Sequence, residues 1–67
     1  MELMTIRQVT ERYPAFTETA LRWQLLNRND NGLCHSVVKV GKRVFFDRIE
    51  FEKWLENQRE EEKTHGN

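Results

Sequence analysis

The chain has 67 residues, of which 37% are apolar, and its eleven basic and eleven acidic residues give a net charge of zero at pH 7. A chain of this length forms one domain with a small core. No apolar run approaches the roughly 20 residues of a membrane span, and the N-terminus lacks the apolar core of a signal peptide. The single cysteine, Cys34, excludes an intramolecular disulfide and suits a reducing compartment, and with His35 alone it cannot build a zinc site. We therefore expect a cytoplasmic protein that uses no membrane, metal or cofactor.

The charges are unevenly spread along the chain. Residues 17–48 hold six basic and three acidic residues, whereas residues 49–67 hold three basic and six acidic residues. A charged partner responds to the local field rather than to the net charge, so the basic middle favours a polyanion. We expect a folded domain over residues 1–58 and an acidic, frayed tail over residues 59–67.

A first helix is predicted from Thr5 onward. Thr5 and Gln8 have the spacing of a capping box, in which each side chain accepts from the other residue's backbone amide. Ile6 and Val9 face inward, and Tyr13 continues that stripe. Pro14 disfavours helical geometry at Tyr13 and ends the helix there.

A second helix is predicted after a short turn in which Phe16 plugs the core. Thr17 is its N-cap, and Glu18 lies in the first turn, where the helix dipole favours an anion. Leu21 and Leu25 form an inward pair, with Ala20 allowing close approach of another helix.

The second helix is expected to end in the turn-rich run Asn27–Gly32. Leu33–Val37 is a connection without a clear pattern. The β-branched and aromatic residues that follow predict two strands, Val38–Val40 and Arg43–Phe46, joined by a two-residue turn at Gly41 and Lys42. The register stays open, because either Val44 and Phe46 or Phe45 could face inward.

A third helix is predicted from the second capping box, Asp47 to Glu50, and its apolar face holds Phe51, Trp54 and Leu55. The element order is therefore helix, turn, helix, basic hairpin, helix. The expected fold is α+β, a small winged helix-turn-helix with two helices, a β-hairpin wing and a C-terminal helix.

No catalytic constellation is recognisable, so we expect a protein that is not an enzyme. Cys34 and His35 are adjacent in a connection, where neighbouring side chains rarely point at each other. The run Glu60–Glu62 is interpreted as a solvated face rather than an acidic site.

The second helix carries the first group of candidate DNA contacts, on or near its outward side: Thr17, Glu18, Thr19, Arg22 and Trp23. Hydroxyls bind phosphate or bases, Arg binds guanine or phosphate, and Glu accepts from a cytosine amine. Simple helix capping is the alternative for Thr17 and Glu18. Arg22 is expected to lack an acidic partner on its own helix and so to be available to DNA. Trp23 fits either the core or a phosphate contact through its indole N–H.

The hairpin carries the second group of candidate contacts. Lys42 and Arg43 lie at or beside its tip, and Lys39 lies on the preceding strand. Such a tip can follow a phosphate backbone or reach into a minor groove. The alternative is an ordinary charged turn that keeps an edge strand soluble.

Four segments taken in order resemble the excisionase-type winged helix-turn-helix proteins of phages and conjugative transposons: residues 5–9, 17–23, 38–43 and 51–55. The run Leu21-Arg22-Trp23 is also similar to the second helix of the smaller relatives of the MerR DNA-binding domain. The resemblance implies a non-catalytic protein that binds double-stranded DNA beside the end of a mobile element, bends it and assists a site-specific integrase. It implies that Thr17, Glu18, Thr19 and Arg22 face the major groove, that Arg22 and Trp23 lie near phosphates, and that Lys42 and Arg43 form the wing.

The leading hypothesis is an excisionase-like recombination directionality factor that binds adjacent sites cooperatively. A small phage or mobile-element transcriptional regulator would use the same domain and differ in the partner it recruits. The third hypothesis is a protein-interaction module in which Trp23, Trp54 and the acidic tail dock a partner.

Overall fold

The computed structural model describes residues 1–59 and leaves residues 60–67 undescribed, so the predicted tail lies outside it except for Arg59. The described part combines helices with a three-stranded antiparallel sheet of order β1-β3-β2, which confirms the α+β class. The elements in chain order are β1 (Leu3–Met4), α1 (Ile6–Arg12), α2 (Glu18–Leu26), α3 (Arg28–Asn31), the 3₁₀ helix η1 (Leu33–Ser36), β2 (Val37–Val40), β3 (Arg43–Asp47) and α4 (Arg48–Glu56).

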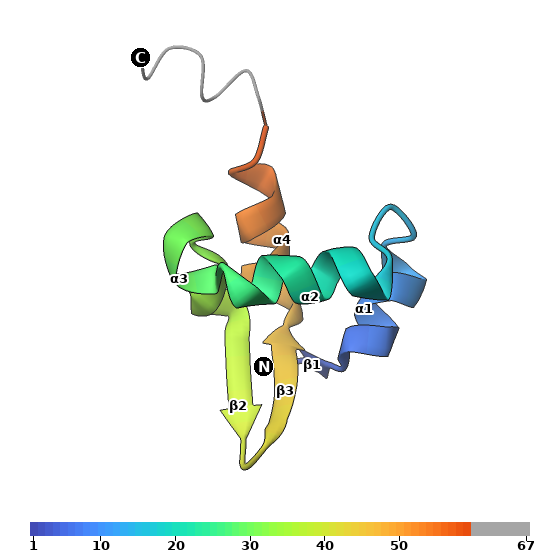
Figure 1. The fold of residues 1–67 in the computed structure, drawn as a ribbon, viewed down its shortest axis with the longest axis vertical. Coiled ribbons are helices and arrows are strands. Elements are labelled where there is room, and N and C mark those ends of the chain that lie inside the picture. The colour runs from blue at the N-terminus through green and yellow to red at the C-terminus, as the bar shows by residue number, and fades with distance from the viewer. Residues whose placement is uncertain (60–67) are drawn as a thin grey trace.

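The β2–β3 hairpin projects from one end of the molecule, and the C-terminal end of α4 points the opposite way (Figure 1). In that view α2 crosses in front of α4, with α1 at one side. No helix within residues 1–59 is long and apolar enough to cross a membrane.

The predicted termini of α1 and α2 are confirmed by their caps. The Thr5 hydroxyl accepts from the Gln8 amide at 3.1 Å, and the Gln8 side chain accepts from the Thr5 amide at 2.9 Å. Tyr13, which precedes Pro14, is the C-cap of α1. The Thr17 hydroxyl accepts from the Ala20 amide and caps α2. These local signals hold because each one depends on atoms within four residues.

Helix α2 buries Leu21 and Leu25, as expected. The role assigned to Ala20 is wrong, because Ala20 is exposed. One residue of helix turns a side chain by about 100°, so Ala20 points away from the face that Leu21 buries.

The connection from α2 to the hairpin is more ordered than the sequence indicated. The short helix α3 follows α2 at once, and η1 fills the stretch that had no clear pattern. The Asn31 side chain donates to the Gln24 carbonyl and accepts from the Leu33 amide, and Gly32 supplies the left-handed φ of +84° that ends α3. A glycine adopts that φ without steric cost, which makes the corner possible.

The hairpin has the predicted turn at Gly41 and Lys42. Val40 pairs with Arg43, and Gly41 has a φ of +62°, while no non-glycine residue in the described part has a positive φ. A positive φ at the first turn position alone is the pattern of a type II′ turn.

The structure also settles the register of the hairpin. Phe46 is fully buried and Val44 packs against the core, so Phe45 faces the other side of the sheet. Strand β2 begins at Val37, and β3 extends to Asp47. Strand β1, which no sequence pattern predicted, pairs Leu3 with Asp47 and Met4 with Phe46.

Helix α4 is capped by the Asp47 carboxylate, which accepts from the Ile49 and Glu50 amides. The reciprocal half of the predicted capping box is replaced by an ion pair, since the Glu50 carboxylate contacts the Lys53 ammonium at 3.3 Å. Phe51 and Trp54 are buried and Leu55 packs against the core, as the periodicity predicted.

Phe51 lies at the centre of an aromatic cluster. Its ring centroid is 5.4 Å from that of Tyr13, 6.0 Å from Phe16, 5.4 Å from Phe46 and 5.7 Å from Trp54. Phe16 therefore reaches the core, as expected. The full set of buried apolar residues in the described part is Met4, Val9, Leu21, Leu25, Leu33, Phe46, Phe51 and Trp54.

Candidate nucleic-acid interface

The first turn of α2 presents three of the candidate residues to solvent. Thr17, Glu18 and Thr19 are all exposed. The Thr17 hydroxyl oxygen accepts from the Ala20 amide, which is the capping role named as the alternative. A hydroxyl that accepts one hydrogen bond can still donate its proton, so capping leaves Thr17 able to bind a phosphate oxygen.

Arg22 is paired, contrary to expectation. Its guanidinium Nη2 lies 3.0 Å from the Glu18 carboxylate, and both side chains are more than half exposed. Glu18 stands four residues before Arg22, the spacing at which helical side chains meet, so the sequence contained this signal. An exposed pair of this kind contributes about 0–1 kcal/mol, and a phosphate can displace the carboxylate at little cost.

Trp23 is 62% exposed, so the alternative that placed its side chain in the core is wrong. The inward face of α2 is already occupied by Leu21 and Leu25, and Trp23 points away from both. Its backbone carbonyl accepts from the Asn27 side chain, which reinforces the end of the helix.

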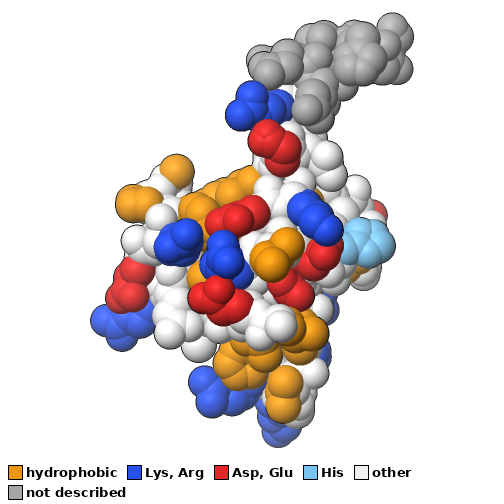
Figure 2. Space-filling view, turned by 180° about the vertical axis from the view of Figure 1, so that it is seen from behind, with side chains coloured by type: hydrophobic (Ala, Val, Ile, Leu, Met, Phe, Trp, Pro, Cys, Tyr) orange, Lys and Arg blue, Asp and Glu red, His pale blue; other side chains and the backbone are white. Residues whose placement is uncertain are grey.

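Lys39, Lys42 and Arg43 are exposed on the hairpin and form no ion pair within residues 1–59. No acidic residue stands between Val37 and Phe46. Their field is therefore not cancelled by a neighbouring carboxylate. Figure 2 shows Lys and Arg side chains beside hydrophobic ones at the hairpin end of the molecule.

The two strands divide these cations between the faces of the hairpin. Lys39 pairs with Val44, whose side chain packs against the core, and so lies on the face that carries the helices. Arg43 lies on the opposite face, where its guanidinium carbon is 5.1 Å from the centre of the Phe45 ring. Stacking on an aromatic ring holds the guanidinium in place while leaving its N–H groups free to donate.

Arg28, the first residue of α3, is a further basic residue beside the end of α2, and it was not among the predicted site residues. Its guanidinium donates to the Leu25 carbonyl at 3.0 Å and forms no ion pair in the described part. A cation at that position complements the C-terminal end of the α2 dipole. Its position could have been predicted, because a basic residue just beyond a helix end is favoured by the helix dipole.

A polar network separate from the predicted DNA contacts joins α1, α4 and the N-terminal segment. The Tyr13 hydroxyl donates to the Glu52 carboxylate at 2.5 Å, and Arg48 contacts both Glu52 and Glu2. Burial, followed by the bond to Glu52, raises the pKa of Tyr13. The bond from Tyr13 lowers the pKa of Glu52, and the bond to Glu2 raises the pKa of Arg48. The network joins the end of α1, the first two turns of α4 and the segment before β1.

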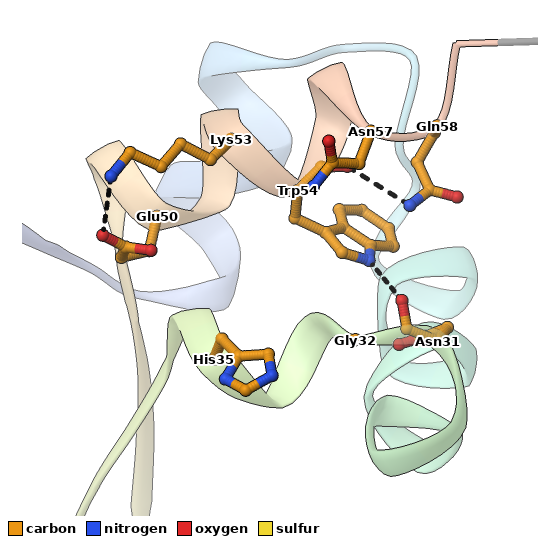
Figure 3. A pocket seen from close by; sticks show the side chains of 8 residues that line it. All are labelled: Asn31, Gly32, His35, Glu50, Lys53, Trp54, Asn57 and Gln58. Atoms are coloured by element: carbon orange, nitrogen blue, oxygen red, sulfur yellow. Dashed lines mark hydrogen bonds and ion pairs between the residues drawn. The ribbon is translucent and has the colours of Figure 1, made fainter. Parts of the chain in front are cut away.

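One hollow of about 290 Å³ lies between η1 and α4 (Figure 3). The Trp54 indole nitrogen donates to the Asn31 carbonyl on one side, and the Glu50–Lys53 ion pair lies on another. His35 points into this hollow from η1, but Cys34 is not among its lining residues. The described residues contain no group of His, Cys, Asp and Glu that could hold a metal ion.

Comparison of the chain with protein-family models, curated proteins and solved structures found no match.

Proposed function

We propose that this protein is a DNA-binding accessory factor with a winged helix-turn-helix arrangement. In this proposal α1 and α2 form the helix-turn-helix, α2 enters the major groove, and the β2–β3 hairpin is the wing. The element order and the projection of the hairpin beyond the helices support it (Figure 1). Thr17, Glu18, Thr19, Arg22 and Trp23 then face the groove and its phosphates.

The observation that carries the proposal is the uncompensated charge of the hairpin. Most basic residues elsewhere in the described part have a carboxylate within 4.0 Å, including Arg7, Arg22 and Arg48. The hairpin cations Lys39, Lys42 and Arg43 have none. Positive groups without acidic neighbours produce a local attraction for phosphate, although the net charge of the chain is zero.

The specific role proposed is that of an excisionase-like recombination directionality factor. The protein would bind and bend DNA near the end of a mobile element in the cytoplasm and assist a site-specific integrase. The resemblance of four ordered segments to excisionase-type proteins supports this role. A small domain with few phosphate contacts binds weakly by itself, so copies would bind adjacent sites cooperatively.

The experiment is a titration of the whole chain against labelled duplex DNA, measured by fluorescence anisotropy at two salt concentrations. One duplex is random, and the other is the DNA that flanks the gene. We expect affinity to fall with salt and the flanking DNA to bind more tightly. A folded protein that binds neither duplex would refute the proposal.

An excision assay with the cognate site-specific integrase then separates recombination from transcriptional regulation. We expect product in the excisive direction to depend on this protein. Binding without any effect on excision would favour the regulator.

The protein-interaction hypothesis assigned Trp54 to the docking surface, and the position of Trp54 argues against that assignment. Trp54 is only 8% exposed and donates its indole N–H to the Asn31 carbonyl, so it cannot dock a partner without leaving the core. That hypothesis predicts that Arg22→Ala and Arg43→Ala leave function intact. Loss of DNA binding in these variants, with the fold retained, would exclude it.

A further inference from the structure

The outward face of α2 carries an apolar stripe. Ala20, Trp23 and Leu26 follow one another at three-residue spacing, and all three are exposed. Trp23 is 62% exposed and Leu26 is 83% exposed. In a chain of 67 residues with a small core, two large apolar side chains on one short helix need an explanation.

Packing within the protein does not account for the stripe. The residues of α2 that pack in the core are Leu21 and Leu25, which lie on the opposite face of the helix. The end of α2 is fixed by the Asn27 side chain and by Arg28, through bonds to the Trp23 and Leu25 carbonyls. Neither bond involves the side chain of Trp23 or Leu26.

The surroundings of the stripe offer donors to a phosphate, although the Glu18 carboxylate lies 3.0 Å from the Arg22 guanidinium and has to be displaced from it. Arg22 lies beside it, and Thr17 and Thr19 present hydroxyls in the preceding turn. Stable protein interfaces bury about 800 Å² on each partner, which is far more than three side chains on a nine-residue helix provide. A single DNA-binding module buries about 600–1,000 Å², but residues that contact phosphates can supply most of that area and of the affinity, so the stripe itself has to cover only a few base edges.

The major groove offers one apolar group to such a stripe. The edges of guanine, cytosine and adenine present donors and acceptors there, whereas thymine adds its C5 methyl group. Residues three apart on a helix are separated by about 4.5 Å along its axis, and neighbouring base pairs by about 3.4 Å. When α2 lies along the groove, side chains at this spacing are close enough to meet methyl groups on neighbouring base pairs.

We infer that Trp23 and Leu26 determine sequence specificity by packing against the methyl groups of neighbouring thymines. This inference rests on the proposed function and names the sequence class that α2 reads. Arg22 and the hairpin cations hold the duplex, and the apolar stripe selects thymine-containing steps.

The test begins with a duplex enriched from a randomised pool by the whole protein. Each thymine of that duplex is then replaced by deoxyuridine, which removes the methyl group and leaves base pairing unchanged. We expect wild-type affinity to fall about fourfold for each methyl that is read, from the transfer free energy of one methylene-sized group. Leu26→Ala should bind the thymine duplex more weakly and become insensitive to one of these replacements.

Ile49→Ala is the matched control, because Ile49 is 52% exposed and lies on α4 rather than on α2. It should keep the full response to deoxyuridine. Circular dichroism should show an unchanged fold for Leu26→Ala, since that side chain is almost fully in solvent.

Three results would overturn the inference, and they can be distinguished from one another. Enrichment of a duplex that binds equally well with deoxyuridine would refute thymine reading and leave the proposed function standing. Failure to enrich or bind any duplex would refute both. Unchanged DNA binding by Leu26→Ala, together with loss of self-association, would assign the stripe to a protein contact.

Discussion

Tyr13 shows how one residue ends an element and also ties it to another. It is the C-cap of α1, its ring packs 5.4 Å from that of Phe51, and its hydroxyl donates to Glu52 on α4. Arg48 continues the network to Glu2 beside β1. Three parts of the chain that are distant in sequence thus meet through one hydroxyl, two carboxylates and one guanidinium.

Tyr13→Phe should destabilise the protein in a defined pH window. The Glu52 pKa lies below its ordinary 4.5, so the stability it contributes is present above pH 4.5 and is lost as pH falls through the lowered value. The Tyr13 pKa lies above 10.0, so its contribution is present below pH 10.0 and is lost as pH rises through the raised value. Thermal unfolding should show the largest difference between variant and wild type near pH 7 and a smaller one at pH 3. An equal difference at both pH values would contradict the network.

Glu18→Gln should free Arg22 and strengthen DNA binding. The Glu18 carboxylate competes with phosphate for the guanidinium and also repels the duplex. We expect affinity for random DNA to rise about two- to fivefold, as measured by fluorescence anisotropy, because an exposed pair is weak.

Glu11→Gln is the matched control for that change, since Glu11 pairs with Arg7 at the same spacing on α1. It should leave affinity almost unchanged. A loss of affinity for the flanking DNA alone in Glu18→Gln would show instead that the carboxylate reads a base.

At the scale of elements, the turn end of the hairpin extends beyond the helices, whereas its base packs against the core (Figure 1). Its tip is beyond the core, its turn depends on the positive φ of Gly41, and its two faces carry different cations. A strand pair of this kind can approach a duplex without disturbing the packing of the helices.

Lys42→Ala should weaken binding to every sequence. The loss of one phosphate contact should reduce the slope of log affinity against log salt by about one unit, measured over a salt series. Lys53→Ala, which removes the same charge from α4, should leave the slope unchanged. Equal slopes for wild type and Lys42→Ala would mean that the tip does not touch DNA.

At the scale of the whole molecule, Trp54 joins α4 to the corner between α3 and η1. Its ring is buried beside Phe51, and its indole N–H donates to the Asn31 carbonyl at 2.8 Å. Gly32 lies against the same ring, since a Cβ there would be 3.9 Å from Trp54 Cδ1. The connection that positions the hairpin is therefore anchored on this one side chain.

Trp54→Phe should cost about 1–2 kcal/mol, because it leaves the Asn31 carbonyl without its donor but keeps a ring in the core. Trp54→Ala should cost about 3–5 kcal/mol, comparable to the whole stability of so small a domain, and leave it largely unfolded. Urea denaturation followed by circular dichroism measures both. A folded and stable Trp54→Ala would mean that this corner is held by other contacts.

The features that could be predicted from the sequence are the local ones. The caps at Thr5, Thr17 and Asp47 were identified because a helix terminus is settled by side chains within four residues. The turn at Gly41 and the buried face of α4 follow from residue type and from periodicity. The Glu18–Arg22 pair was equally local and could have been read from its spacing.

The remaining features depend on contacts between distant segments. Strand β1 is two residues long and exists because β3 offers it an edge more than 40 positions away. Trp23 and Trp54 are the same residue type on amphipathic helices, yet packing leaves one in solvent and buries the other. Packing in the core likewise decides that the ring of Phe46, and not that of Phe45, faces inward. At these positions burial was decided by the assembled core, in which side chains from distant segments compete for a limited volume, and the pattern of one segment could not choose between the alternatives.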